Sequence, residues 1–412
     1  MALADTQLGT GLFTGRAVYG SGVFDNLAED VSDIVSMISP YETPFLNLIG
    51  DADKEADNVL HEWLEEEMTP NAIVNSVSVA STTASTAIPI KGGLALFLQK
   101  GMVLRGPEAA GGEYMQITAI TANTIVVDRA FATTNANSFG ASEFLTVISD
   151  AAVEGADVLV DISRPRPRLN NIIQLFKKDL IISGTTRAVR MLGGDMDEMD
   201  RQIRNRTREA LRDLEKASIL GRLSGNTIGS SSAVRTMRGL LQMIATNVFT
   251  INNTSYTGAY DSTSMQAFET YVNTAIRDAW TQGGTDLDLI LCGDGVKQRF
   301  DKLNNSRVRV VNEERLYTNQ VTRYENTYGN YTVMLDRWMP THIAAITATP
   351  RLKIAPLRGR SFQYEPVAKT GDATKGMVIG EYTLEHRNEV GMAQISFDAM
   401  KPAAGQRLIQ AP

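Results

Sequence analysis

The sequence predicts an α+β protein, because short strand-like runs occupy most of the chain and one long amphipathic helix stands between them. The chain has 412 residues, more than a single hydrophobic core normally organises, so at least two packed units are expected. Hydrophobic residues make up 43% of the chain and charged residues 21%. This composition excludes a disordered chain, a collagen-like repeat and a membrane bundle.

The first 53 residues have the composition of an N-terminal arm. Glycines interrupt them repeatedly, and residues 1–70 contain 14 acidic but only two basic side chains, whereas the whole chain has a net charge of −7. One interpretation is that these acids are simply solvated. The other is that an acidic arm docks on a basic body, in the same subunit or in a neighbour.

Apolar side chains gather at the end of this arm. Residues 33–51 have the spacing of short helical turns, which Pro40 and Pro44 break, and a cluster containing Phe45 and Ile49 follows. An apolar cluster on an arm needs a surface to cover it. Phe45 is therefore a candidate for contact with another subunit.

A pair of distant strands is expected next. Residues 58–68 alternate as a strand does, and their expected partner lies far downstream at residues 168–186. We assign residues 54–72 and 156–180 to this two-stranded extension, and its length requires a folded module between the strands.

Residues 73–155 have the composition of that inserted β module. They are rich in threonine, serine, valine and isoleucine, and glycine, asparagine or proline separates their strand-like runs. The four runs cover residues 101–107, 113–120, 123–131 and 143–149. The alternative is that this segment is one more part of a large all-β core.

The strongest helical pattern covers residues 193–225, and we assign the helix itself to 195–223. Its apolar stripe consists of Met199, Ile203, Ala210, Leu211, Leu214, Ala217 and Leu220. Seven acidic and seven basic side chains balance along it, and Asp197 with Arg201 and Asp200 with Arg204 are spaced as ion pairs. The balance favours a solvated or intersubunit face over a nucleic-acid-binding one.

A second packed unit is expected for residues 285–345. Its first strand ends at a glycine turn that leads into a helix at 296–303, and a hairpin follows with its turn near Gly329. The remaining segments, 181–284 and 346–412, are assigned to the unit that holds the long helix. Four further strands are expected, at residues 342–348 and 351–357 and as two strands within 377–397 joined by a turn near Asn388.

The sequence contains no credible active site. The single cysteine, Cys292, excludes an internal disulfide, and three histidines, at 61, 342 and 386, lie far apart. No phosphate-binding glycine loop and no GxSxG or HExxH motif is present. We therefore expect no catalytic residue, no metal, no cofactor and no enzyme activity. If the chain were instead an oligomeric enzyme with a site between subunits, Asp294 and His342 would be tested first.

Several segments, in consistent order along the chain, resemble the major head proteins of tailed double-stranded DNA bacteriophages. They are SPYETPFLNLIG (39–50), EW (62–63), LIISGTTRAV (180–189), LRDLEKASILG (211–221), VMLDRWMP (333–340) and KTGDATKGMVIGEYTLEHRNE (369–389). The resemblance implies the Hong Kong 97-type capsid fold. That fold has an N-terminal arm, an extended loop, a peripheral domain with a long spine helix, and an axial domain. The strand pair corresponds to the extended loop, the helix at 195–223 to the spine, and residues 285–345 to the axial domain.

The resemblance further implies a major capsid protein that assembles into hexamers and pentamers of a closed head around double-stranded DNA. A separate scaffold, a portal and possible decoration proteins are the implied partners. The net charge of −7 argues against sequence-specific DNA binding. The implied location is the virion, after synthesis in the host cytoplasm, because the start of the chain resembles no secretory signal and no membrane-spanning run is found. An encapsulin-like nanocompartment shell is the alternative within the same fold.

A closed coat needs contacts between copies, and the extended loop supplies candidates. We expect Glu65, Glu66 and Glu67 to pair with arginines of an adjacent subunit. The candidate arginines are Arg164, Arg166 and Arg168. Phe45 and Trp63 complete the predicted interface residues.

Overall fold

The computed structural model describes residues 42–66, 68, 71–80, 83–133, 135–152, 154–155, 166–188, 198–223, 229–230, 232–251, 262–284, 286–303, 322–369 and 371–401. Most of the expected arm, residues 1–41, therefore lies outside the described residues. So do Glu67, Arg164 and the expected start of the long helix at residues 195–197.

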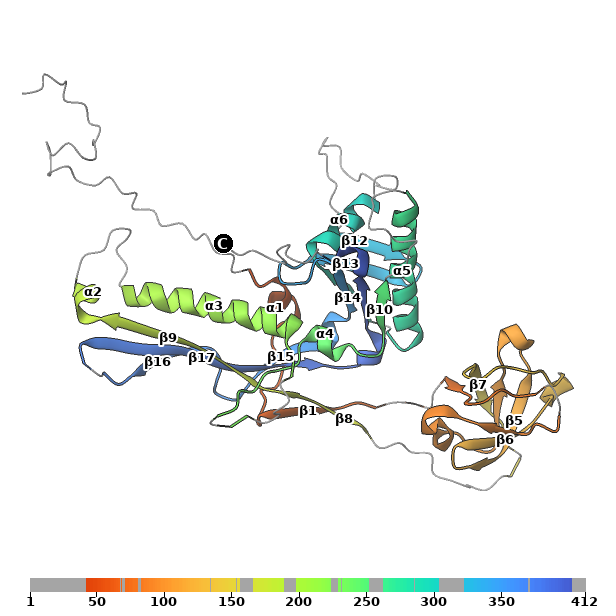
Figure 1. Cartoon of the computed structure of the whole chain (residues 1–412). Helices are drawn as coiled ribbons and strands as arrows, with labels where there is room; N and C mark the ends of the chain where they lie inside the picture. The colour runs from red at the N-terminus through yellow and green to blue at the C-terminus, as the bar shows by residue number, and fades with distance from the viewer. Residues whose placement is uncertain are drawn as a thin grey trace, which may run out of the picture.

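A four-stranded antiparallel sheet forms one half of the body (Figure 1). Its strands are β9 (Gln174–Ser183), β15 (Leu352–Pro356), β16 (Gln363–Val367) and β17 (Ala373–His386). The long strand β17 pairs with β9 on one edge and with β15 and β16 on the other. Helix α3 (Glu198–Leu220) lies along this sheet, and the short helix α2 (Gly184–Ala188) follows β9.

A six-stranded mixed sheet forms the other half, in the order β10-β18-β14-β11-β13-β12. Its strands are β10 (Val248–Ile251), β11 (Leu289–Cys292), β12 (Arg323–Asn326), β13 (Gly329–Leu335), β14 (Ile343–Thr347) and β18 (Ala393–Phe397). Helices α5 (Ser262–Thr281) and α6 (Asp294–Leu303) belong to this half. The expected strand, glycine turn and helix are confirmed here, as is the β12–β13 hairpin.

Two strands of this sheet come from outside residues 285–345. Strands β10 and β18 join it, so the turn at Asn388, which adopts positive φ, connects β17 in one sheet to β18 in the other. The expected turn is thus present, although the two strands do not pair with each other. Helix α5 is an element that the sequence analysis did not identify.

One continuous hydrophobic core joins the two halves. Phe268 of α5 lies fully buried at its centre, with ring centroids 5.1 Å from Phe300 and 5.0 Å from Phe397. The same core includes Phe45 and Ile49 of helix α1 (Pro44–Ile49). It also receives the short helix α4 (Leu240–Met243). The two halves are therefore held by shared burial of apolar area.

The extended loop begins with a two-stranded antiparallel sheet. Strand β1 (Leu60–Leu64) pairs with β8 (Arg168–Ile172), which confirms the predicted pairing of distant segments. The expected partner strand is split, however, because β9 turns away from β1 and pairs with β17 instead. The β1–β8 pair leads away from the body toward a separate unit (Figure 1).

That unit is a β module with its own sheet and its own core. Its strands are β2 (Ala72–Val74), β3 (Ala87–Pro89), β4 (Met102–Arg105), β5 (Tyr114–Thr121), β6 (Thr124–Asp128) and β7 (Phe144–Asp150). All four predicted strands are present, and β2 and β3 are additional. The core side chains, among them Leu104, Met115 and Ile125, are fully buried and form a cluster separate from that of the body.

A buried ion pair fixes the loops of the module. The Arg129 guanidinium donates to both carboxylate oxygens of Glu113, at 2.7 and 2.6 Å, and both side chains are almost completely buried. Glu113 also accepts the backbone N–H groups of Ala130 and Asn137. Burial by itself raises the pKa of Glu113, but these hydrogen bonds outweigh it and hold the pKa below its usual value.

The long helix differs from its prediction in which side chains it buries. Ala210 and Leu214 are buried as expected, but Leu211 and Leu220 are 37% and 43% exposed, and Glu215 is fully buried. Arg201 pairs with Glu198, one turn away, at 2.6 Å, and its expected partner Asp197 lies outside the described residues. The helix therefore buries fewer apolar side chains than the predicted seven-residue stripe contains.

Because the module has a separate core, Leu104→Ala should destabilise the module alone, by about 2–5 kcal/mol for a fully buried leucine. Amide hydrogen exchange would show faster exchange across β4–β7 and unchanged protection in α5 and β11. Leu64→Ala, at a site 57% exposed, is the control and should change stability by less than about 0.5 kcal/mol. Equal loss of protection in both regions would contradict an independent core.

Candidate assembly surfaces

Exposed ion pairs line the base of the extended loop. Arg166 lies 3.4 Å from Glu66, and Arg168 lies 4.0 Å from Glu62, and both pairs join β1 and β8 or the residues beside them. All four side chains remain 40–73% exposed. These charges are therefore paired within the chain, yet still accessible to another copy.

Glu65 has a different role from its neighbour Glu66. Its Oε1 atom accepts the backbone N–H of Asn388 at 2.6 Å, at the turn between β17 and β18. This contact holds the base of the extended loop to the body. The intersubunit pairing expected for Glu65, Glu66 and Glu67 stays a prediction, with Glu67 and Arg164 outside the described residues.

A histidine–glutamate contact adds a second attachment of the loop to the body. His61 Nε2 lies 3.2 Å from Glu385 Oε2, and Arg387 pairs with the other carboxylate oxygen. The hydrogen bond from His61, followed by that from Arg387, outweighs burial and lowers the pKa of Glu385 below its usual value. Strand β1 is thus fixed to β17 at His61 as well as through Glu65.

Phe45 and Trp63, the two apolar candidates for subunit contact, are covered by their own chain. Phe45 is fully buried in the body core, and Trp63 is 7% exposed beside His61. The Trp63 Nε1 donor has no hydrogen-bond partner among the described residues. In the described subunit neither ring offers much surface to a neighbour, because the body itself covers the apolar cluster at the end of the arm.

The sequence analysis missed the group that holds this cluster in place. Both carboxyl oxygens of Glu215 accept backbone N–H groups at the start of α1, from Phe45 at 2.8 Å and from Leu46 at 2.9 Å. The available signal was Ile219, an apolar residue one turn after Glu215 on the same side of the helix.

A second buried acid lies beside Glu215. Asp336 accepts the N–H of Trp338 through Oδ1, whereas its buried Oδ2 has no partner among the described donors. Burial, followed by the neighbouring Asp336, raises the pKa of Glu215 to about 8, and burial also raises the pKa of Asp336. Glu215 is therefore mostly protonated at neutral pH, because two charged carboxylates buried side by side are strongly disfavoured.

Asp294 and His342 are the residues that the sequence analysis would test first in an enzyme. Among the described residues they form no recognisable catalytic group. Asp294 opens α6, and His342 stands before β14 with a buried Nδ1 that has no hydrogen-bond partner in the described structure. Burial lowers the pKa of His342 and raises that of Cys292 to about 12, so the thiol stays protonated. Within the described ranges, no cluster of histidine, cysteine and acidic side chains could hold a metal ion.

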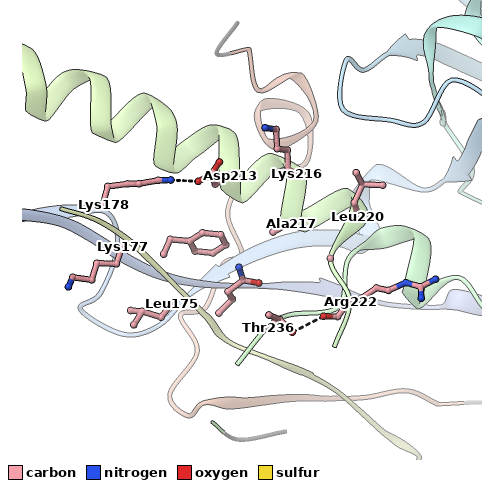
Figure 2. Close-up of a pocket in the computed structure, with 12 residues that line it drawn as sticks. Leu175, Lys177, Lys178, Asp213, Lys216, Ala217, Leu220, Arg222 and Thr236 are labelled. Atoms are coloured by element: carbon pink, nitrogen blue, oxygen red, sulfur yellow. Dashed lines mark hydrogen bonds and ion pairs between the residues drawn. The ribbon is translucent and has the colours of Figure 1, made fainter. Parts of the chain in front are cut away.

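A groove lies between α3 and β9, with a volume of about 520 Å³ (Figure 2). The C-terminal half of α3 forms one wall and residues 174–178 of β9 form the other. Lys178 pairs with Asp213 across it, as Figure 2 shows.

A membrane-spanning helix is absent from the described residues, because none of their helices combines the necessary length with the necessary hydrophobicity.

Comparison with known proteins identifies one family. The profile of the family described as SU10 major capsid protein matches residues 9–397. A search of curated proteins finds no match.

Similar solved structures include capsids and an encapsulin. The capsid of an empty GTA particle aligns with a TM-score of 0.51 and 9% identity, over 92% of this chain and 99% of that chain. The capsid of Myoviridae phage XM1 gives a TM-score of 0.48 and 9% identity, over 93% of this chain and 100% of that one. The holo-SrpI encapsulin complex from Synechococcus elongatus gives 0.38 and 9%, over 60% and 80%. The expected Hong Kong 97-type capsid fold is confirmed.

The raised pKa of Glu215 gives a pH dependence of known sign. Protonated Glu215 stabilises the folded state. This stabilisation is complete below pH 4.5, the pKa of the residue in the unfolded chain, and is lost as pH rises through the folded-state pKa of about 8. The free energy of unfolding should therefore fall as pH rises from about 4.5 to about 8 and change little above that, measured by guanidinium unfolding with tryptophan fluorescence.

Glu215→Gln keeps the site uncharged and should remove most of this fall. Glu215→Ala leaves two buried N–H groups without an acceptor and should cost about 1–3 kcal/mol already at pH 6. A fall of the same size in wild type and Glu215→Gln would assign the pH dependence to other groups.

Proposed function

We propose, because this chain belongs to the SU10 major capsid protein family, that many copies of it assemble into the closed head of a tailed bacteriophage around double-stranded DNA. Hexamers and pentamers are the proposed building units, and the assembled protein is located in the virion. The observation that carries this proposal is the family match over residues 9–397. The fold shared with the GTA particle capsid supports it.

The shape of the subunit also supports a shell. A closed coat needs large contacts made by elements that reach beyond their own body. The β1–β8 pair and its β module extend in this way (Figure 1), and the base of the loop is fixed to the body through Glu65 and His61. A rigid base lets the loop present its surface in one orientation to the next copy.

The role is structural, without catalysis. We further propose that a separate scaffold directs assembly, that a portal occupies one vertex, and that decoration proteins are possible partners. The net charge of −7 suits a container that encloses DNA without holding its phosphates. Synthesis takes place in the host cytoplasm.

Expression of the chain, alone and with a candidate scaffold, should give closed particles in negative-stain electron micrographs. A monomer at every concentration and salt tested, with scaffold present, would overturn the proposal. Particles that co-purify with a cargo enzyme would instead identify an encapsulin-like compartment.

Glu66 tests the proposed contact between subunits. Its pair with Arg166 is exposed, so losing it should cost the subunit less than about 1 kcal/mol. Glu66→Lys should leave circular dichroism and thermal unfolding unchanged while reducing the yield of closed particles severalfold. Glu55→Lys, at an exposed site earlier in the chain, is the control and should assemble normally. Wild-type particle yields from Glu66→Lys would remove Glu66 from the interface.

A further inference from the structure

The β module closes on itself, so its outward side chains are the part that can meet a partner. Its sheet runs from β2 at one end to β3 at the other. Asn75, just after β2, bridges Ile90, just after β3. The N–H of Ser76 also donates to the carbonyl of Pro89 at 2.8 Å. These contacts join the two ends of the described sheet, and such closure protects strand edges from pairing with another chain.

One outward face of the module is apolar. Phe144 of β7 lies directly opposite Val74 of β2, and Thr146 lies opposite Ala72. Because paired residues point to the same side of a sheet, these four side chains share one face, and the core of the module lies on the other. Phe144 is 66% exposed, and Ile148, further along β7, is 48% exposed. We refer to these five side chains as the module face.

The backbone that presents Phe144 is fixed from within. Asn75 is fully buried, and its Oδ1 atom accepts the N–H of Glu143 at 2.7 Å. Its Nδ2 atom donates to the carbonyls of Val77 at 2.6 Å and Gly140 at 2.7 Å. An exposed aromatic ring on a rigid strand loses little conformational entropy on binding, which is typical of the residues that dominate protein interfaces.

The body of the same subunit is held away from the module face. Strands β1 and β8 carry the module outward (Figure 1). Their base is fixed, because Glu65 accepts the N–H of Asn388 at 2.6 Å and His61 lies 3.2 Å from Glu385. The module could fold back onto its own body only by breaking these contacts. In a shell built of many copies, the molecule beside the module is a second copy of this chain.

A second apolar surface lies at the other end of the subunit. Ile181 of β9 and Val367 of β16 both pair with Lys375 of β17, so the three side chains share one face of the four-stranded sheet. Ile181 is 68% and Val367 45% exposed, and Leu175, on the same side of β9, is 42% exposed. Helix α3 covers the opposite side, where Leu180 is buried. We refer to the exposed side as the sheet face, and Figure 1 shows it far from the module.

We propose that the module face of one subunit packs against the sheet face of a second copy. Lys177 and Asp179, on the same side of β9, pair with each other at 3.1 Å, so they present little net charge to an apolar partner. Because the two faces are unlike and lie at opposite ends, the contact is head-to-tail and generates a ring when its rotation closes. Such rings are the pentamers and hexamers of the proposed function, on which this inference rests.

Cysteine cross-linking in assembled particles tests the contact. Thr146→Cys places a thiol in the module face and Asp179→Cys places one in the sheet face, both at exposed positions, whereas the native Cys292 is buried and does not react. Particles assembled from an equal mixture of the two variants and treated with a short bismaleimide should give cross-linked dimers on a denaturing gel. Particles of the double variant should give a ladder of up to five and six chains, and neither single variant alone should cross-link.

Phe144→Ser removes the exposed ring and should reduce cross-linking in the double variant at least fivefold. Hydrogen exchange across β4–β7 should stay as in wild type, which shows that the module remains folded. Val234→Ser, at a body site 78% exposed, is the control and should leave cross-linking unchanged. A loss of particles confined to Phe144→Ser is the same result in a stronger form.

Three outcomes would overturn this inference and leave the proposed function standing. They are particles of the mixture without cross-links, equal cross-linking in one single variant alone, and no effect of Phe144→Ser. Failure of the wild-type chain to form particles with scaffold present would overturn both.

Discussion

The buried carboxyl of Glu215 is the contact on which the arrangement of the body depends. It belongs to α3, it accepts two N–H groups at the start of α1, and it lies beside Asp336, which follows β13. One side chain therefore links the end of the arm, the long helix and the six-stranded sheet. A buried carboxyl is stable when it is protonated or hydrogen-bonded, and Glu215 combines a pKa raised to about 8 with hydrogen bonds from two backbone N–H groups.

Single polar side chains also attach the extended loop to the body at its base. Glu65 and His61 tie β1 to the body, while Glu66 and Arg166 stay exposed on the adjoining surface. Neighbouring residues just after the end of β1, Glu65 and Glu66, thus divide between holding the loop and facing outward. The β module keeps its own core and its own buried Arg129–Glu113 pair. A capsid subunit can carry such an insertion because the module buries its apolar side chains in its own core and not in the core of the body.

Elements with a strong local signal could be predicted from the sequence. The β12–β13 hairpin, the strand and helix around Gly293, and four strands of the module follow from period and turn residues alone. Helix α5 has equally regular spacing, with Phe268, Val272 and Ile276 buried, and was not predicted although the spacing is a sufficient signal. Glu215 was counted with the solvated charges because the helix was assigned by its average pattern. The apolar Ile219, one turn away, is the local sign of its burial.

The sequence by itself determined the α+β class, the long helix and the inserted β module. It also indicated the capsid family, through short segments that occur in a consistent order along the chain. It did so because each of these depends on residue period, turn chemistry or a recognisable string. Only the tertiary structure decided that β17 and β18 part into different sheets, that β9 leaves β1 for β17, and that Phe45 is covered by its own chain. Those outcomes depend on which segments, distant in the sequence, pack against each other. The free energy gained by burying a side chain depends on the surface that covers it as well as on the side chain itself.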